Sequence, residues 1–301
     1  MSDVFHQGEL AVQDRAGVVM QARKVGQIIS SDLPEGADRY LASLPILFRG
    51  GADERGDVWA SVLTGGQGFA RVVDSHTVEI RADSVRSDPL ERVDEGSMPA
   101  GFLAIDLATR QRFRFNGRAQ RVGDTLRVHV EQAYGNCPKY IQLRKVTVHT
   151  DPPEVGPVDT GSQLSDGDAD LIQRADTFFI ASMAQGRGAD VSHRGGQPGF
   201  ARVTPDGDIA FRDYPGNNMF QTLGNLTADP RAGLLFIDFD TGTTLQLSGR
   251  AKVIWAETNP DDLADTGRSV TFRPQRVVRT GQAVPLRWVL KSYSPYNPDE
   301  K

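Results

Sequence analysis

The sequence predicts a mainly β protein made of two copies of one barrel-like domain. The chain has 31 glycines and 17 prolines in 301 residues, which indicates many turns between short strands. Its length exceeds what one hydrophobic core usually fills, so two domains are expected. The strongest observation is an internal repeat, because a repeat determines the architecture before any motif is interpreted.

The repeat consists of two pairs of segments. Residues 100–119 align with residues 232–251 at a constant offset of 132, and nine of the twenty positions are identical. GGQGFARV from Gly65 also aligns with GGQPGFARV from Gly195, with Pro198 as the single insertion. We therefore expect an N-terminal helical extension over residues 1–36, a first barrel over 37–147, a proline-rich linker over 148–163 and a second barrel over 164–301.

Two segments outside the copies have their own patterns. Val12, Ala16 and Val19 recur at roughly helical spacing, so one amphipathic helix is expected before the first copy, where it would cap or join the domains. Three prolines between residues 152 and 157 should stiffen the linker and keep it out of a sheet.

Within the second copy, short apolar runs separated by glycine-containing turns predict strands. One helix is expected between two of these strands, because Phe220, Leu223 and Leu226 are spaced for one helix face and Pro230 would end it. The strands are expected over residues 177–184, 189–194, 199–204, 208–213, 234–240 and 243–256. The first copy has an equivalent segment in which Pro89 suits an early helical position.

Composition excludes several classes of function. A net charge of −5 gives no overall attraction to nucleic acid or anionic lipid, and no apolar run approaches the roughly 18 residues that a membrane helix needs. The single cysteine, Cys137, cannot form an internal disulfide, and the polar start of the chain lacks a signal core, so a cytoplasmic location is expected. The five histidines show no ligand spacing, so no metal site is predicted.

An arginine-rich strand has two interpretations. Arg110, Arg112 and Arg114 share one strand face, and Phe113 and Phe115 share the other. The arginines could form an anion or nucleic-acid stripe. With the overall negative charge, we favour a strand whose phenylalanines enter the core and whose arginines face solvent.

Two segments of the second copy are candidates for binding phosphate. The start of the predicted helix, around Asn217 and Asn218, offers free backbone amides, although the residues alone slightly favour a plain turn with one asparagine as N-cap. In SHRGG, Arg194 is the strongest candidate, with Ser192 on the same strand face and His193 opposite. A structural histidine and a solvated arginine are the alternative. The aligned positions of the first copy are Val62, Leu63 and Thr64, which indicates a degenerate site there.

The order of these motifs resembles a known family. NCPKYIQLR in the first copy and ADTFFIAS, SHRGGQPGFARV, DYPGNNMFQTLGNL and GLLFIDF in the second resemble the FMN-binding split barrels of the pyridoxamine 5′-phosphate oxidase-like superfamily, in a tandem branch. In that family FMN lies between the two barrels of a dimer. The resemblance therefore implies a fused pseudo-dimer of two split barrels.

The resemblance also implies a set of residues that bind FMN. In the second copy, Ser192, Arg194, Asn217, Asn218 and Thr222 would hold the phosphate and ribityl end. In the first, Lys139 and Gln142 would donate hydrogen bonds to the flavin edge, and Tyr140 would flank the ring. The further expected contacts are His193, Gly195, Asp213, Tyr214, Met219 and Phe220.

The implied function is an oxidoreductase in which FMN passes hydride or electrons between a small substrate and an acceptor. No side chain is expected to act as acid or base, and Cys137 is expected to be inert. The alternatives are a flavin or haem binding module without turnover and a scaffold without cofactor. A small molecule is the expected partner, with a homodimer as a further option.

Overall fold

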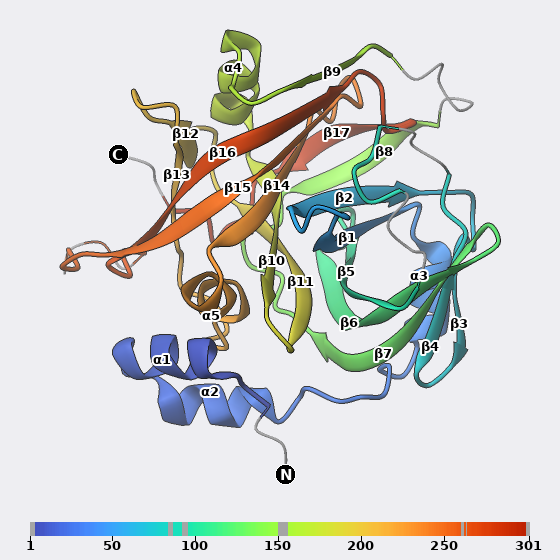
Figure 1. Ribbon diagram of the computed structural model, residues 1–301, viewed down its shortest axis with the longest axis horizontal. Coiled ribbons are helices and arrows are strands. Elements are labelled where there is room, and N and C mark those ends of the chain that lie inside the picture. The colour runs from blue at the N-terminus through green and yellow to red at the C-terminus, as the bar shows by residue number, and fades with distance from the viewer. Residues whose placement is uncertain are drawn as a thin grey trace.

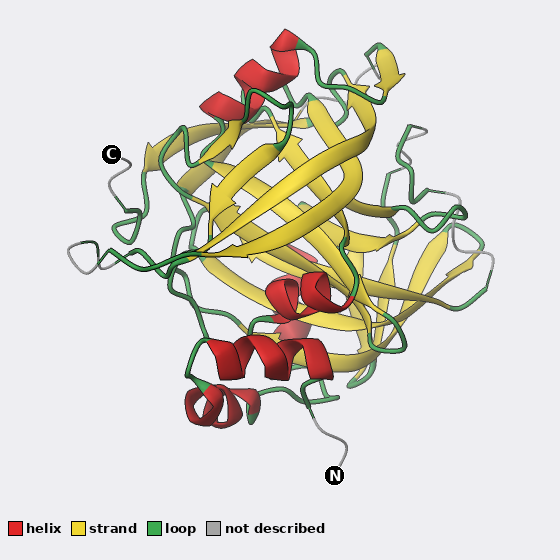
Figure 2. Cartoon of the chain, turned by 60° about the vertical axis from the view of Figure 1, so that its left-hand side comes forward, coloured by secondary structure: helices red, strands yellow, loops and turns green. Residues whose placement is uncertain are grey.

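The computed structural model describes residues 4–83, 87–91, 96–149, 156–259, 262 and 264–298. It is mainly β, with two large antiparallel sheets that lie against each other and helices on the outside (Figures 1 and 2). Among the described residues, no helix is both long and apolar enough to cross a membrane.

The first sheet contains seven strands in the order β2-β1-β5-β6-β7-β4-β3. It curves around a core that includes Leu47, Phe102 and Phe115, so the expectation that Phe113 and Phe115 enter the core is confirmed. The strands are β1 (Ile46–Ala52), β2 (Val58–Thr64), β3 (Ala70–Asp74), β4 (Thr77–Ile80), β5 (Met98–Asp106), β6 (Gln111–Val122) and β7 (Thr125–Gly135).

The second sheet has the same strand order, β11-β10-β14-β15-β16-β13-β12, with the short strand β9 added beside β16. Its core includes Phe178, Phe236 and Phe272. The expected strands of this copy are present within a few residues of their predicted bounds. These are β10 (Thr177–Ala184), β11 (Gly188–Gly195), β12 (Ala201–Val203), β13 (Ile209–Arg212), β14 (Arg231–Ile237) and β15 (Thr244–Trp255). The sheet also contains two strands that were not predicted, β9 (Val158–Gly161) and β16 (Arg268–Thr280).

The two barrels meet through equivalent residues, as in a two-fold pseudo-dimer. Phe48 and Phe179 stack with ring centroids 3.5 Å apart. A Cβ at Gly101 would lie 2.4 Å from the carbonyl oxygen of Ala189, and one at Gly233 would lie 2.5 Å from the Cα of Trp59. Because each of these two glycines contacts a strand of the opposite barrel, only glycine fits at both positions. A third apolar cluster, which includes both phenylalanines, fills this interface.

The ends of the two copies also pair. β8 (Leu143–His149) follows the first barrel and β17 (Leu286–Ser292) follows the second, and together they form a two-stranded sheet. The segment predicted as a linker is not free of sheet structure, because Val158–Gly161 pairs with β16. The prolines at 152 and 153 lie outside the described residues. The domain boundaries stay a prediction.

Five helices lie outside the sheets. The expected single N-terminal helix is two helices, because Gly17 adopts a φ of +68° between them and ends the first. The predicted helix after Asp213 is present and ends before Pro230, whereas residues 87–91 form a turn rather than the expected helix. The helices are α1 (Gln7–Arg15), α2 (Val19–Gly26), α3 (Ala37–Ser43), α4 (Asp166–Arg174) and α5 (Gln221–Ala228).

Candidate functional site

A cleft lies between the two barrels, with one wall from each. The first barrel contributes β6 and the segment after β7, and the second contributes the end of β11, the loop from Asp213 and the start of α5. It is lined by Arg112, Arg114, Asn136, Cys137, Lys139, Tyr140, His193, Arg194, Gly195, Asp213, Tyr214, Gly216, Asn217, Asn218, Phe220, Gln221, Thr222 and Leu223. Most residues predicted from the sequence are therefore brought together here.

Ser192 lies directly behind the lining. Its hydroxyl oxygen is 2.8 Å from that of Thr222 and accepts a hydrogen bond of 2.6 Å from Arg114 Nη2. His193 and Arg194 both line the cleft, although they alternate along β11. Both residues lie just before the end of β11 at Gly195 and are still paired with β10.

Two predicted residues lie elsewhere. Gln142 is fully buried: its Nε2 donates to the carbonyl oxygens of Asp176 (3.2 Å) and Gly196 (3.1 Å), and its Oε1 accepts from the backbone N–H of Ser294. Its amide therefore ties the C-terminal segment to both barrels and does not reach the cleft. Met219 is also fully buried, in a cluster with the N-terminal helices.

Three arginines give the cleft its charge. Arg114 is buried, and Arg112 and Arg194 are half-buried, yet none of them forms an ion pair within the described residues. The lining contains one carboxylate, that of Asp213, which accepts a 2.9 Å hydrogen bond from Arg268 Nε. The lining thus carries more positive than negative side chains, and its one carboxylate is ion-paired with Arg268.

The expectation that Arg112 and Arg114 face solvent is wrong. Their strand face lies outside the first barrel but is covered by the second, where Arg114 meets Ser192. The alternation of Arg110, Arg112 and Arg114 on one face was the available signal. Arg110 has a structural role, because it donates hydrogen bonds to the carbonyl oxygens of Ile141 and Ser292.

Some hydrogen-bond donors of the cleft arginines have no acceptor among the described residues. The Nε atoms of Arg114 and Arg194 are inaccessible to solvent and have no hydrogen-bond partner in the described part of the chain. Burial lowers the pKa of Arg112 to about 10, and repulsion from Arg114 contributes. Burial also lowers the pKa of Arg194. Because an unpaired buried charge is costly, this arrangement favours binding of an anion.

His193 is neutral and has a defined tautomer. Burial holds its pKa well below the usual value, and the charges of Arg112 and Arg194 act in the same direction. Its Nδ1 lies 3.2 Å from Arg112 Nη1. Since a guanidinium can only donate, Nδ1 accepts and the proton is assigned to Nε2. That N–H has no partner among the described residues.

Strained backbone surrounds the cleft. Tyr140, Asn218 and Phe220 have φ values of 67°, 62° and 62°, in the left-handed region that bulky residues rarely adopt. Phe220 is the N-cap of α5, in place of the asparagines expected there, and no side chain caps the helix. The first amides of α5 therefore lack side-chain partners at the cleft wall.

Aromatic residues join the two walls. The rings of Tyr140 and Tyr214 lie 5.2 Å apart, and the Tyr140 hydroxyl donates to the carbonyl oxygen of Pro215 at 2.9 Å. Burial raises the pKa of Tyr140 to about 12, so its hydroxyl remains a donor at neutral pH. The described residues hold no group of three or more His, Cys, Asp or Glu side chains suited to a metal ion.

A second, smaller cleft lies where the two-fold relation between the barrels places the counterpart of the first cleft. The register opposes Val62 to Phe48 and His193 to Phe179. The counterparts of Ser192, His193 and Arg194 are therefore Ser61, Val62 and Leu63, one position earlier than the sequence alignment predicted. Ser61 keeps the serine, whereas the apolar residues replace histidine and arginine, and all three line this cleft.

The chain closes this second cleft with residues 87–91. The carboxylate of Asp88 accepts hydrogen bonds from Ser61 Oγ (2.7 Å) and from Gln246 Nε2 (3.4 Å), where Gln246 is the repeat counterpart of Arg114. Leu90 is buried against Trp59 and Val278. The pair Arg114–Ser192 of the first cleft thus corresponds to Gln246–Ser61 here, without the positive charge.

Comparison with known proteins identifies the second barrel. Residues 165–291 match the family described as pyridoxamine 5′-phosphate oxidase. This match over the second barrel confirms the resemblance, seen in the sequence, to the pyridoxamine 5′-phosphate oxidase-like split-barrel family. No curated protein matches the chain.

Several solved structures are similar to part of the chain. HupZ of Group A Streptococcus has 12% identity and a TM-score of 0.32, covering 38% of this chain and 92% of its own. A putative pyridoxamine 5′-phosphate oxidase of Lactobacillus delbrueckii has 12% identity and a TM-score of 0.30, covering 38% and 93%. An FAD binding protein of Mycobacterium smegmatis has 15% identity and a TM-score of 0.27, covering 41% and 98%. At these values the similarity carries no argument about ligands.

Proposed function

We propose that the cleft binds FMN and that the protein is an FMN-dependent oxidoreductase. The observation that carries this proposal is the group Arg112, Arg114 and Arg194, three guanidinium groups without a carboxylate partner beside the uncapped start of α5. A phosphate monoester supplies the missing counter-charge and accepts from guanidinium and backbone N–H groups. The family of the second barrel agrees with this ligand.

The residues divide into two groups by what they offer. Arg194, Thr222 and the first amides of α5 would hold the phosphate, with Ser192 and Arg114 behind Thr222. Tyr140 and Tyr214 present aromatic surface for a flat ring. When bound, FMN would supply hydride or electron transfer to a small substrate.

His193 would provide a neutral donor in this cleft. Its Nδ1 accepts from Arg112, so its remaining donor is the Nε2–H, which is buried and has no partner among the described residues. An N–H can donate to a carbonyl or ring nitrogen but has no lone pair for a metal. This observation favours a flavin over a haem at this imidazole.

Comparison of FMN with riboflavin tests the proposal. FMN should bind at least about 100-fold more tightly, since charge-assisted hydrogen bonds to phosphate contribute several kcal/mol. Arg194→Ala should remove most of this preference, whereas Arg118→Ala should not, because Arg118 is an exposed arginine of β6 that bonds to Ser97. Equal binding of FMN and riboflavin by the unaltered protein would contradict the phosphate site.

The catalytic part of the proposal needs a separate measurement. Under anaerobic conditions, NADH or NADPH should bleach the visible absorption of the bound flavin, and an added electron acceptor should restore it. A flavin that neither reductant bleaches would support a carrier or sensor instead.

A further inference from the structure

The N-terminal helix α1 lies directly against α5, the helix that begins at the cleft (Figure 1). Two glycines make this contact. A Cβ at Gly8 would lie 2.3 Å from the carbonyl oxygen of Gly224, and a Cβ at Gly224 would lie 2.5 Å from Glu9 Cγ. Because neither approach tolerates a side chain, the two helices pack backbone to backbone.

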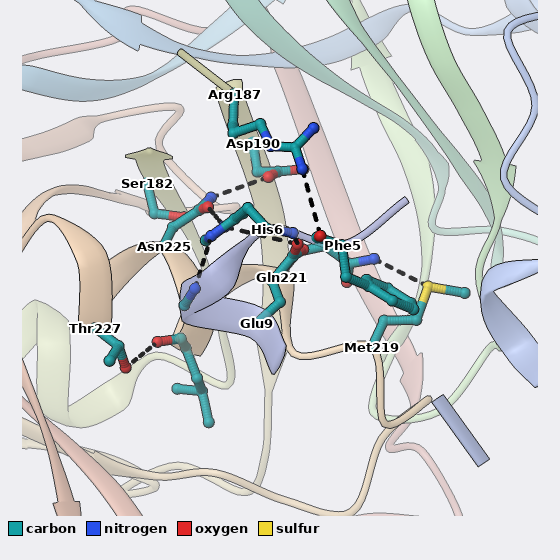
Figure 3. Close-up of polar contacts among 12 residues, drawn as sticks. Phe5, His6, Glu9, Ser182, Arg187, Asp190, Met219, Gln221, Asn225 and Thr227 are labelled. Carbon is teal, nitrogen blue, oxygen red and sulfur yellow. Dashed lines mark hydrogen bonds and ion pairs between the residues drawn. The ribbon is translucent and has the colours of Figure 1, made fainter. Parts of the chain in front are cut away.

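Buried polar groups bind the start of α1 to α5 and β11 (Figure 3). His6 Nδ1 accepts from the N–H of Gly8, so Nε2 carries the proton and donates to Asn225 Oδ1 at 2.8 Å. Asn225 Nδ2 in turn donates to Asp190 Oδ2 at 3.0 Å and to Ser182 Oγ at 3.1 Å. The start of α1 is thus hydrogen-bonded to the side chain of α5 that holds this network together.

The same network continues to the cleft. Asp190 Oδ1 accepts from Asn116 Nδ2 at 2.6 Å and lies 3.4 Å from the hydroxyl of Tyr134. Tyr134 contacts Arg114, which donates to Ser192 beside Thr222. Since Thr222 and Asn225 lie one turn apart on α5, a displacement of α5 at the α1 contact moves the cleft wall as well.

We propose that docking of α1 on α5 is coupled to ligand binding in the cleft, with His6, Glu9 and Asn225 as positioning residues. Docked α1 holds α5, and with it Thr222, at the cleft wall. Undocking lowers the affinity for the ligand, and by reciprocity the bound ligand strengthens docking. This inference rests on the proposed FMN site.

Glu9 makes the coupling sensitive to pH. Burial raises its pKa to about 8, the nearby Asp190 acts in the same direction, and the His6 N–H and Arg187 oppose the shift. Tyr134 also faces this group, but burial raises its pKa, so it stays neutral. Burial lowers the pKa of His6, so His6 is neutral above pH 6.5.

The sign of the pH effect follows from proton binding. Docked Glu9 holds a proton that undocked Glu9 releases near its ordinary pKa of 4.5, so docking weakens as pH rises from that value to about 8. The docking constant falls by up to about tenfold per pH unit in this range. Between pH 6.5 and 8, Glu9 is the group of the network whose charge changes.

The experiment combines FMN titration with amide hydrogen exchange of the full-length protein. Gly8→Leu introduces a better helix former that cannot dock, so it should remove exchange protection in α1, lower protection of the first turn of α5 and weaken FMN binding at least tenfold. Ala11→Leu, an exposed position on α1, is the matched control and should change none of these.

FMN titration at different pH values tests the role of the Glu9 charge. The unaltered protein should lose FMN affinity as pH rises from 6.5 to 8, Glu9→Gln should lose much less, and Asp14→Asn, at an exposed position of α1, should behave as the unaltered protein. The coupling would be overturned if Gly8→Leu removed the exchange protection of α1 but left that of α5 unchanged, whether or not ligand is present. Failure of the unaltered protein to bind FMN would instead overturn the proposed function, and the α5 exchange would still decide the coupling.

Discussion

The two clefts between the barrels share one geometry and differ in charge. In the first, Arg114 donates to Ser192 beside a helix start, and the lining carries three guanidiniums. In the second, Gln246 contacts Ser61 and Asp88, and residues 87–91 fill the place of the helix. The duplicated fold thus supplies two equivalent positions, and a few side chains decide which one can hold an anion.

The largest effect is expected when residues of the first cleft are replaced by their counterparts from the second. His193→Val with Arg194→Leu installs the residues found at Val62 and Leu63. Without the guanidinium, FMN binding should weaken at least about 100-fold, or about 3 kcal/mol. Isothermal titration measures this, with circular dichroism to verify folding. Retained affinity would place the ligand elsewhere.

A smaller effect is expected from opening the second cleft. Asp88→Ala removes the acceptor for Ser61 Oγ and for the Leu90 N–H, which should lower the free energy of unfolding by about 1–3 kcal/mol in urea denaturation. The number of bound flavins should not change, because Val62 and Leu63 stand where the first cleft has His193 and Arg194, and Asp83 and Glu91 still oppose Arg49 and Arg121. Appearance of a second FMN site in this variant would show that residues 87–91, rather than the missing charges, exclude the ligand.

The sequence was sufficient for the elements that local patterns define. Alternation and glycine turns located the strands of the second copy, and the spacing of Phe220, Leu223 and Leu226 located α5. The repeat predicted two similar sheets, and their strand orders agree. Gly17 shows the limit of periodicity, since its left-handed conformation divides one apparent helix into two.

The sequence predicted Lys139, Tyr140 and the second-barrel motifs of the cleft, but it did not predict Arg112 and Arg114 as lining residues. Arg112 and Arg114 had the spacing of solvent-facing residues, and nothing local shows that the second barrel covers their face. Gln142 looked available because its partners, such as Ser294, are distant in sequence. The one-residue difference between the alignment and the observed pairing of Ser61 with Ser192 likewise depends on strand register.

Counting FMN molecules per chain by equilibrium dialysis of the unaltered protein tests the account most directly. The first cleft has an excess of guanidinium groups, whereas in the second Asp83, Asp88 and Glu91 oppose Arg49 and Arg121. The account therefore predicts one FMN per chain. Two per chain would contradict the difference between the clefts, and none would contradict the function proposed for the first.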